Sequence, residues 1–302
     1  MAFLGGTSGD GREQARRSWR FGDGLLAMGL VALALVGTSE IWAVIWRIGR
    51  HNEEQSHVLL APFVAAWLFW VRRERLRFCK PGFSPVGPVL IAAGWALAAF
   101  GFRGAFDLFW HLGGLIVVLG ALVTVVGVEP LRRFAPAFGA LLFLLPVPGR
   151  IRQQIALPLQ ESSATVTTFV LDTFGVPITQ AGNLMTVNGV DIAVAEACNG
   201  MRMVAALLLV TYAFVFSTPM RNSVRIGLVL ISPVLALLVN VIRLVPTALW
   251  HGYGSERGAG MFHDIAGWAM LGIAAVLLWG ILGLLRWLEV PIAPYAIAED
   301  ER

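Results

Sequence analysis

The chain has 302 residues, of which 57% are hydrophobic and 14% are charged, and its formal net charge is +4. A soluble globular domain carries about 25% charged residues, so this composition, with a mean hydropathy of +0.72, excludes an ordinary soluble domain and indicates a membrane protein. The basic residues lie between apolar blocks, as membrane-topology signals do, and no basic face is interleaved with aromatic residues. We therefore expect no nucleic-acid partner.

The apolar blocks predict an all-α polytopic membrane protein of about eight transmembrane helices, because a span needs roughly 17–25 largely apolar residues. The predicted spans lie at about 24–46, 58–71, 85–102, 106–128, 134–148, 199–217, 226–250 and 264–285. We expect residues 1–302 to form a single integral membrane domain.

Basic residues set the predicted orientation. The 23 Lys and Arg residues gather mostly before the first span, in "RRERLRFCK", "EPLRRF" and "MRNSVR", and after the last span. By the positive-inside rule these stretches are cytoplasmic, so 1–23 and 286–302 are predicted cytoplasmic tails and 149–197 an extracytoplasmic insertion. The first 20 residues hold four arginines but lack an apolar core followed by a small-residue cleavage site. No cleaved signal peptide is therefore expected.

The extracytoplasmic insertion changes its hydrophobic period along its length. Its first part predicts an amphipathic helix that lies on the membrane and is interrupted or kinked near Pro158. The apolar residues at near-helical spacing are Ile155, Leu159, Val166, Val170 and Leu171. The second part alternates with a period of two around Asn188 and Gly189. Because both central residues of a type I′ turn need positive φ, this pair predicts a small β-hairpin.

The two cysteines are predicted to lie on opposite sides of the bilayer. Cys79 belongs to a cytoplasmic loop, whereas Cys198 follows the predicted hairpin at the outer face, so the two cannot form a disulfide with each other. Cys198 is then a lone thiol in an oxidising compartment, where an unpaired cysteine is a liability unless it is used. The alternative is that Cys198 serves only as a small hydrophobe in a helix.

Polar residues gather at the same predicted leaflet. Arg202 lies one helical turn beyond Cys198, and Asn240 and Arg243 share a helix face by their spacing. Arg243 lies about seven residues, or roughly 10 Å, below the outer mouth near Trp250, where an arginine more often pairs inside a bundle than serves as an anchor. Arg202 could still be a snorkelling anchor.

His263 begins the last predicted span beside Asp264, and it could simply be a capped helix-terminal residue. Its presence with Cys198 and Arg243, however, completes the inventory for thiolate chemistry: neighbouring cations lower a thiol pKa, a histidine moves the proton, and an arginine stabilises an anionic oxygen. Glu196 precedes the cysteine on the same face.

The order of these blocks resembles the exosortase/archaeosortase family of membrane cysteine transpeptidases. "AEACNGMR" is followed about 40 residues later by "NVIR" and then by "FHDIAGW", and "QSHVLLAP" and "LLPVPGRI" are supporting matches. The resemblance covers roughly residues 24–290. One residue departs from it, because many members have Ser where this chain has Asn199, and that change could mark a different recognition signal.

The resemblance implies a peptidase or transpeptidase of the cell inner membrane. Its substrates would be secreted proteins with a C-terminal sorting signal of the PEP-CTERM type: a short motif, a transmembrane helix and a basic cluster. The acyl group would pass through a thioacyl-enzyme to an amine, water or a surface or exopolysaccharide-related acceptor. By motif position, Cys198 would be the nucleophile, Arg243 the oxyanion or thiolate partner and His263 the acid and base. The supporting residues would be Arg202, Asn240, Glu196 and Asn199.

Other functions fit the sequence less well. A transporter or assembly scaffold is the main alternative, but transporters tend to place polar groups near the bilayer midplane in repeated halves. Serine, metallo and aspartyl intramembrane proteases are disfavoured because their motifs are missing from the sequence. The five histidines are scattered, so we expect neither a metal site nor a cofactor.

Overall fold

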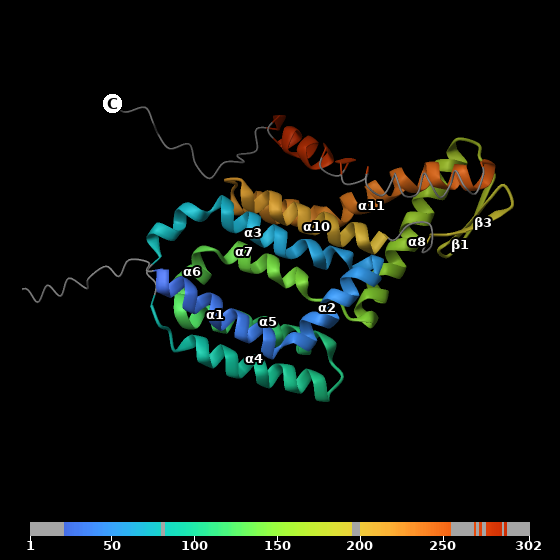
Figure 1. Ribbon diagram of the computed structural model, residues 1–302. Helices are drawn as coiled ribbons and strands as arrows, with labels where there is room; N and C mark the ends of the chain where they lie inside the picture. The colour runs from blue at the N-terminus through green and yellow to red at the C-terminus, as the bar shows by residue number, and fades with distance from the viewer. Residues whose placement is uncertain are drawn as a thin grey trace, which may run out of the picture.

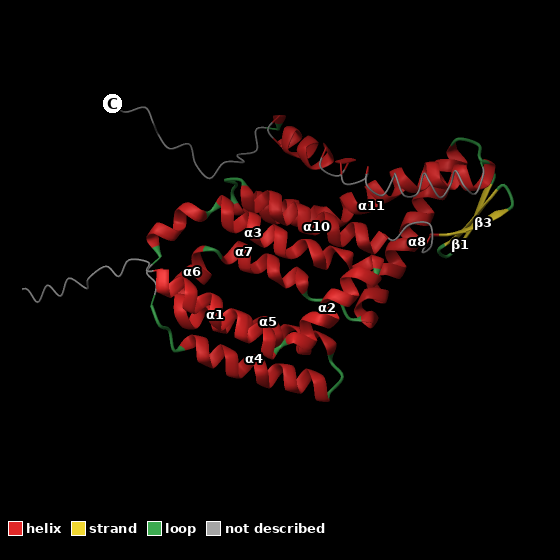
Figure 2. Ribbon diagram, in the orientation of Figure 1, coloured by secondary structure: helices red, strands yellow, loops and turns green. Residues whose placement is uncertain are grey.

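The computed structural model describes residues 21–79, 82–194, 200–254, 269, 272–273, 276–285 and 287–288, with the backbone alone at 53 and 200–202. The described part is mostly helical and carries one small sheet (Figures 1 and 2). The first half contains α1 (Phe21–Gly37), α2 (Ser39–His51), η1 (Glu53–Leu60), α3 (Ala61–Val71), η2 (Arg73–Phe78), α4 (Val86–Arg103) and α5 (Asp107–Val126). The second half contains α6 (Val128–Arg133), α7 (Ala135–Ala140), η3 (Leu141–Leu144), α8 (Gly149–Thr173), β1 (Ile178–Ala181), β2 (Leu184–Val187), β3 (Val190–Ala193), α10 (Gly200–Ser217) and α11 (Asn222–Tyr253).

Three described helices are long and apolar enough to cross a bilayer, namely α4, α5 and α11. The bent pair α1–α2 makes a fourth candidate if it counts as one span. Shorter apolar helices occupy Ala135–Leu144, Met203–Ser217 and Val276–Leu285. The expectation of a helical membrane protein with a small sheet is thus confirmed, whereas eight full-length spans are not.

The first predicted span, 24–46, is not one continuous helix. Its two halves, α1 and α2, meet at Thr38 with a bend of 76°. The Thr38 hydroxyl donates to the carbonyl of Ala34 at 2.7 Å and accepts the indole N–H of Trp42 at 2.8 Å. The side chain thus holds both sides of the bend, and the polar residues Thr38, Ser39 and Glu40 interrupt the apolar run at this point.

Glycines bring α4 and α5 into close contact. A Cβ atom on Gly94 would lie 2.8 Å from the carbonyl oxygen of Gly113, and a Cβ atom on Gly87 would overlap the backbone of Thr124. In lipid, where apolar burial does not drive helices together, small residues permit this backbone approach and the dispersion contacts it brings. Figure 1 shows the two helices side by side.

The segment predicted to be the extracytoplasmic insertion contains α8 followed by an antiparallel sheet of order β1-β2-β3. Asn188 and Gly189 have φ values of 50° and 78°, and Val187 pairs with Val190 across them. The predicted hairpin is therefore confirmed, with β1 as an additional strand. Helix α8 passes through Pro158 as a single element, so the helix continues where an interruption was one expectation.

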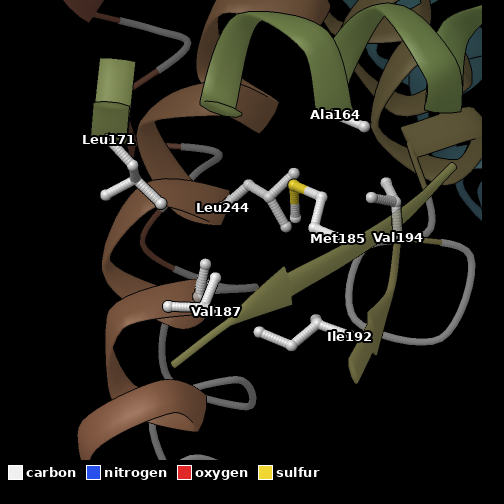
Figure 3. Packing of buried hydrophobic residues seen from close by; sticks show 8 residues of the cluster. Ala164, Leu171, Met185, Val187, Ile192, Val194 and Leu244 are labelled. Atoms are coloured by element: carbon white, nitrogen blue, oxygen red, sulfur yellow. The ribbon is translucent and has the colours of Figure 1, made fainter. Parts of the chain in front are cut away.

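The sheet packs against α8 and the second half of α11 through one hydrophobic cluster. Met185 of β2, near the centre of Figure 3, is fully buried in this cluster. The cluster consists of Ala164, Leu171, Met185, Val187, Ile192, Val194, Leu244 and Ala248. Figure 1 shows the sheet, α8 and the last turns of α11 together at one end of the molecule.

Candidate active site

Two of the predicted site residues, Asn240 and Arg243, lie in the described part of the chain with their side chains. Both are on α11, and both are buried. Arg202 lies in the first turn of α10, where only the backbone is described. The remaining predicted residues, Cys198, Glu196, Asn199 and His263, lie outside the described residues.

Arg243 lies in a protein-lined part of α11. Its side chain is only 2% exposed, and its carbonyl accepts the hydroxyl of Thr247 at 2.7 Å. The next residue, Leu244, belongs to the cluster beneath the sheet. Burying a charge is costly unless the protein compensates it, so an arginine in this position is a strong candidate for a site-forming residue.

The C-terminal end of α11 continues beyond Trp250, the predicted outer mouth of the helix. The helix runs to Tyr253, and Asn188 of the hairpin donates its side-chain N–H to the carbonyl of Gly252 at 3.0 Å. A Cβ atom on Gly252 would lie 2.6 Å from a methyl group of Val187, so only glycine allows the hairpin to lie this close. The segment that carries Arg243 is therefore held by both α8 and the sheet.

Polar residues of α8 face α11. The Asn240 side-chain N–H donates to the Ser163 hydroxyl at 3.0 Å, and that hydroxyl donates to the carbonyl of Leu159 at 2.8 Å. One turn earlier, Gln160 accepts the side-chain N–H of Asn183 at 3.2 Å. Sequence reasoning missed this contribution of α8, although the buried residues Gln160, Ser163 and Thr167 recur at the three- and four-residue spacing of one helix face.

The apolar residues of α8 do not share one environment. Ile155 and Val166 are exposed, whereas Ser163 and Thr167 are fully buried. Leu171, another of the predicted apolar residues, is buried in the cluster beneath the sheet. The helix therefore buries its small and polar residues together with part of the predicted apolar set.

The sequence blocks "QSHVLLAP" and "LLPVPGRI" come together in the structure. Gln55, only 6% exposed, accepts the backbone N–H of Val147 at 2.9 Å. An ion pair of 3.0 Å joins Arg152 of α8 to Glu54 of η1, and η1 also packs against α10. Because α8 packs against both α10 and α11, these contacts connect the two sequence blocks to the helices that carry the predicted site.

His57 in η1 is another buried titratable group at this end. Its side chain is 5% exposed. Burial lowers the pKa of His57 below the ordinary histidine value, and a hydrogen bond with the Glu54 backbone offsets this in part. A histidine kept neutral in this way is suited to packing rather than to ion pairing.

Cys79 has the properties of an unreactive thiol. It is buried beside η2 and donates to the carbonyl of Arg75 at 3.5 Å. Burial raises the pKa of the Cys79 thiol above its ordinary value, which lowers the thiolate fraction on which nucleophilicity depends. Cys79 therefore offers a matched control for Cys198.

Comparison with known proteins gives one family. The model of the transmembrane exosortase family matches residues 42–280, which includes every predicted site residue. No curated protein and no solved structure matches the chain.

Proposed function

This chain belongs to the transmembrane exosortase family, and we propose that it is a cysteine peptidase or transpeptidase acting on secreted proteins at the outer face of the inner membrane. Its substrates are proteins with a C-terminal sorting signal of the PEP-CTERM type. The observation that carries the proposal is the buried Arg243 on α11, a helix that packs against α8 and the sheet. In the sequence, Cys198 follows the last residue of β3 by five positions.

Chain connectivity limits how far Cys198 can be from Arg243. Val194 is fully buried in the cluster that also contains Leu244, the residue after Arg243. Cys198 is four residues beyond Val194, and four residues span at most about 14 Å. On the other side, α10 begins at Gly200, two residues later. These limits support a site in which Cys198 and Arg243 act on the same peptide bond.

In the proposed reaction, the sulfur of Cys198 attacks the carbonyl carbon of the substrate. His263 takes the thiol proton, and Arg243 donates hydrogen bonds to the oxygen that becomes negative in the tetrahedral intermediate. When the C–N bond breaks, His263 gives the proton to the leaving amine, and a thioester with Cys198 remains. An acceptor amine, or water, then attacks the thioester and transfers its proton to His263, which returns a proton to the thiolate.

The supporting residues have positional roles in this proposal. Glu196 and Arg202 flank the nucleophile and balance charge around the thiolate, and Asn199 provides a hydrogen-bonding side chain next to it. Asn240 lies one turn before Arg243 on the same face of α11. The acyl acceptor is an amine or a surface or exopolysaccharide-related group.

The proposed orientation places this site outside and both termini in the cytoplasm. Figure 1 shows the sheet, α8 and the end of α11 gathered at one end of the molecule. At the opposite end, Arg72 after α3 donates to the carbonyl of Phe216 near the end of α10 at 2.7 Å, and Arg225 donates to Val215 at 3.1 Å. Basic residues at that end support a cytoplasmic placement.

A cysteine-exchange experiment tests the proposal. We expect Cys198→Ala to abolish C-terminal processing of the substrates while the protein still inserts into the membrane at normal levels. Cys79→Ala removes the buried thiol instead and should leave processing unchanged. Processing at the usual rate in Cys198→Ala cells would contradict the cysteine mechanism and favour a transporter or scaffold.

A further inference from the structure

The contact between Ser163 of α8 and Asn240 of α11 joins residues 77 positions apart in the chain. Both side chains are shielded from solvent, with 0% and 1% of their surfaces exposed. The Ser163 oxygen accepts from the Asn240 amide, and its own hydrogen is donated to the Leu159 carbonyl. The serine hydroxyl thus fixes the orientation of the asparagine amide.

This orientation leaves the amide oxygen of Asn240 as an open acceptor. Oδ1 is buried and has no hydrogen-bond partner among the described residues. Leaving a buried acceptor unpaired is unfavourable, and native structures contain few such groups. Reversing the amide would instead set its oxygen against a hydroxyl whose hydrogen goes to Leu159, and would leave both N–H groups in the unpartnered position. Within the part of the chain that the structure describes, this acceptor is therefore available for a donor that a ligand brings.

The open acceptor lies close to the group that we propose as the oxyanion partner. Asn240 and Arg243 are three residues apart on α11, which places them on one face and about 4.5 Å apart along the helix axis. The face therefore offers an acceptor followed by a charged donor. In an extended peptide, each residue directs its own N–H and C=O to the same side, as the paired bonds of an antiparallel ladder show.

We propose that Ser163 is a positioning residue that holds Asn240 so that its Oδ1 accepts the backbone N–H of the substrate residue whose carbonyl is attacked. Arg243 holds the carbonyl oxygen of that same residue. Asn240 and Arg243 together grip one extended residue on the acyl side of the cleaved bond. This inference rests on the proposed function and adds a contribution from α8 to substrate binding.

A substrate that lacks the single N–H provides the test. The probes are two synthetic peptides that span the cleaved bond of a secreted protein processed by the intact chain. In one peptide an ester oxygen replaces the N–H of the acyl-side residue, and the cleaved amide itself is unchanged. The measured quantity is the ratio of kcat/KM for the amide peptide to that for the ester peptide, which does not depend on how much of each preparation is folded.

For the unaltered protein we expect a kcat/KM ratio of roughly 5–10, which corresponds to the net contribution of one ordinary hydrogen bond. In Ser163→Ala and Asn240→Leu the ratio should fall toward one. Ser162→Ala is the matched control, because Ser162 is an exposed neighbour on the same helix. Its hydroxyl donates to the carbonyl of Pro158 at 2.7 Å, four residues earlier, just as the Ser163 hydroxyl donates to the carbonyl of Leu159. Its ratio should stay at the unaltered value.

The outcomes separate this inference from the proposed function. A ratio near one in the unaltered protein, or an unchanged ratio in Ser163→Ala, overturns the positioning role while Cys198-dependent cleavage stands. If the unaltered protein cleaves neither peptide, the proposed function fails and this inference fails with it.

Discussion

Gln55 connects two distant parts of the chain through a single side chain, and replacing it tests whether that connection stabilises the bundle. Its Oε1 accepts the backbone N–H of Val147 at 2.9 Å, and the residue is only 6% exposed. Gln55→Met keeps the length and approximate volume of the side chain but removes the acceptor, so the Val147 N–H stays buried without a partner. An unsatisfied buried donor costs about 1–3 kcal/mol. This corresponds to roughly a 5- to 150-fold rise in the unfolding equilibrium constant.

The free energy of unfolding can be followed in detergent micelles by tryptophan fluorescence, since the chain has 11 tryptophans. Gln154→Met on α8 is the control, because Gln154 is exposed and the same substitution there should change the unfolding free energy by less than about 0.5 kcal/mol. Equal stabilities for the two variants would refute the role assigned to the Gln55 hydrogen bond.

Three further predictions follow from Arg243, His57 and Gly87. Arg243→Lys keeps the positive charge but loses the planar guanidinium with its paired N–H donors. The kcat/KM for substrate cleavage should therefore fall about 10²- to 10³-fold, while the amount of protein in the membrane stays normal. An unchanged kcat/KM would exclude the oxyanion role. Burial lowers the pKa of His57, so the unfolded chain binds the proton first as the pH falls below about 6.5, and the folded protein loses stability there. His57→Gln should flatten this pH dependence of thermal unfolding, whereas His51→Gln, the control, should not. A pH dependence that persists in His57→Gln would show that another group causes the loss of stability. In Gly87→Val the added Cβ overlaps the backbone of α5, so the free energy of unfolding should fall by about 1–3 kcal/mol. An unchanged unfolding midpoint would show that α4 and α5 do not need this close approach.

Local turn chemistry explains why the hairpin could be predicted from sequence. The pair Asn188 and Gly189 has few alternatives to a type I′ turn, and both residues have positive φ in the structure. The strand β1 was missed even though its turn to β2 begins with Gly182 at φ 62°. A glycine at the first central position is the signal of a type II′ turn, so this strand was accessible to the same reasoning.

Features that depend on contacts between distant segments were not accessible. The bend of 76° within the predicted span 24–46 is a different case, because the Thr38 bonds to Ala34 and Trp42 are local and the polar residues 38–40 mark the bend in the sequence. The spacing of Asn240 and Arg243 correctly places both on one helix face, because helical period is a local property. Their partner Ser163 is 77 residues away, and no single-sequence pattern encodes such a pairing. The convergence of Cys198 and His263 on this face stays a prediction.

Intact-mass spectrometry of the protein incubated with its substrate peptide tests the central claim most directly. The account predicts an adduct with the mass of the acyl fragment on Cys198, which hydroxylamine releases, and no adduct on Cys79. Arg243→Lys should accumulate this adduct far more slowly at the same protein level. Cleavage of the peptide by Cys198→Ala, or by the unaltered protein with an adduct only at another residue, would contradict the account.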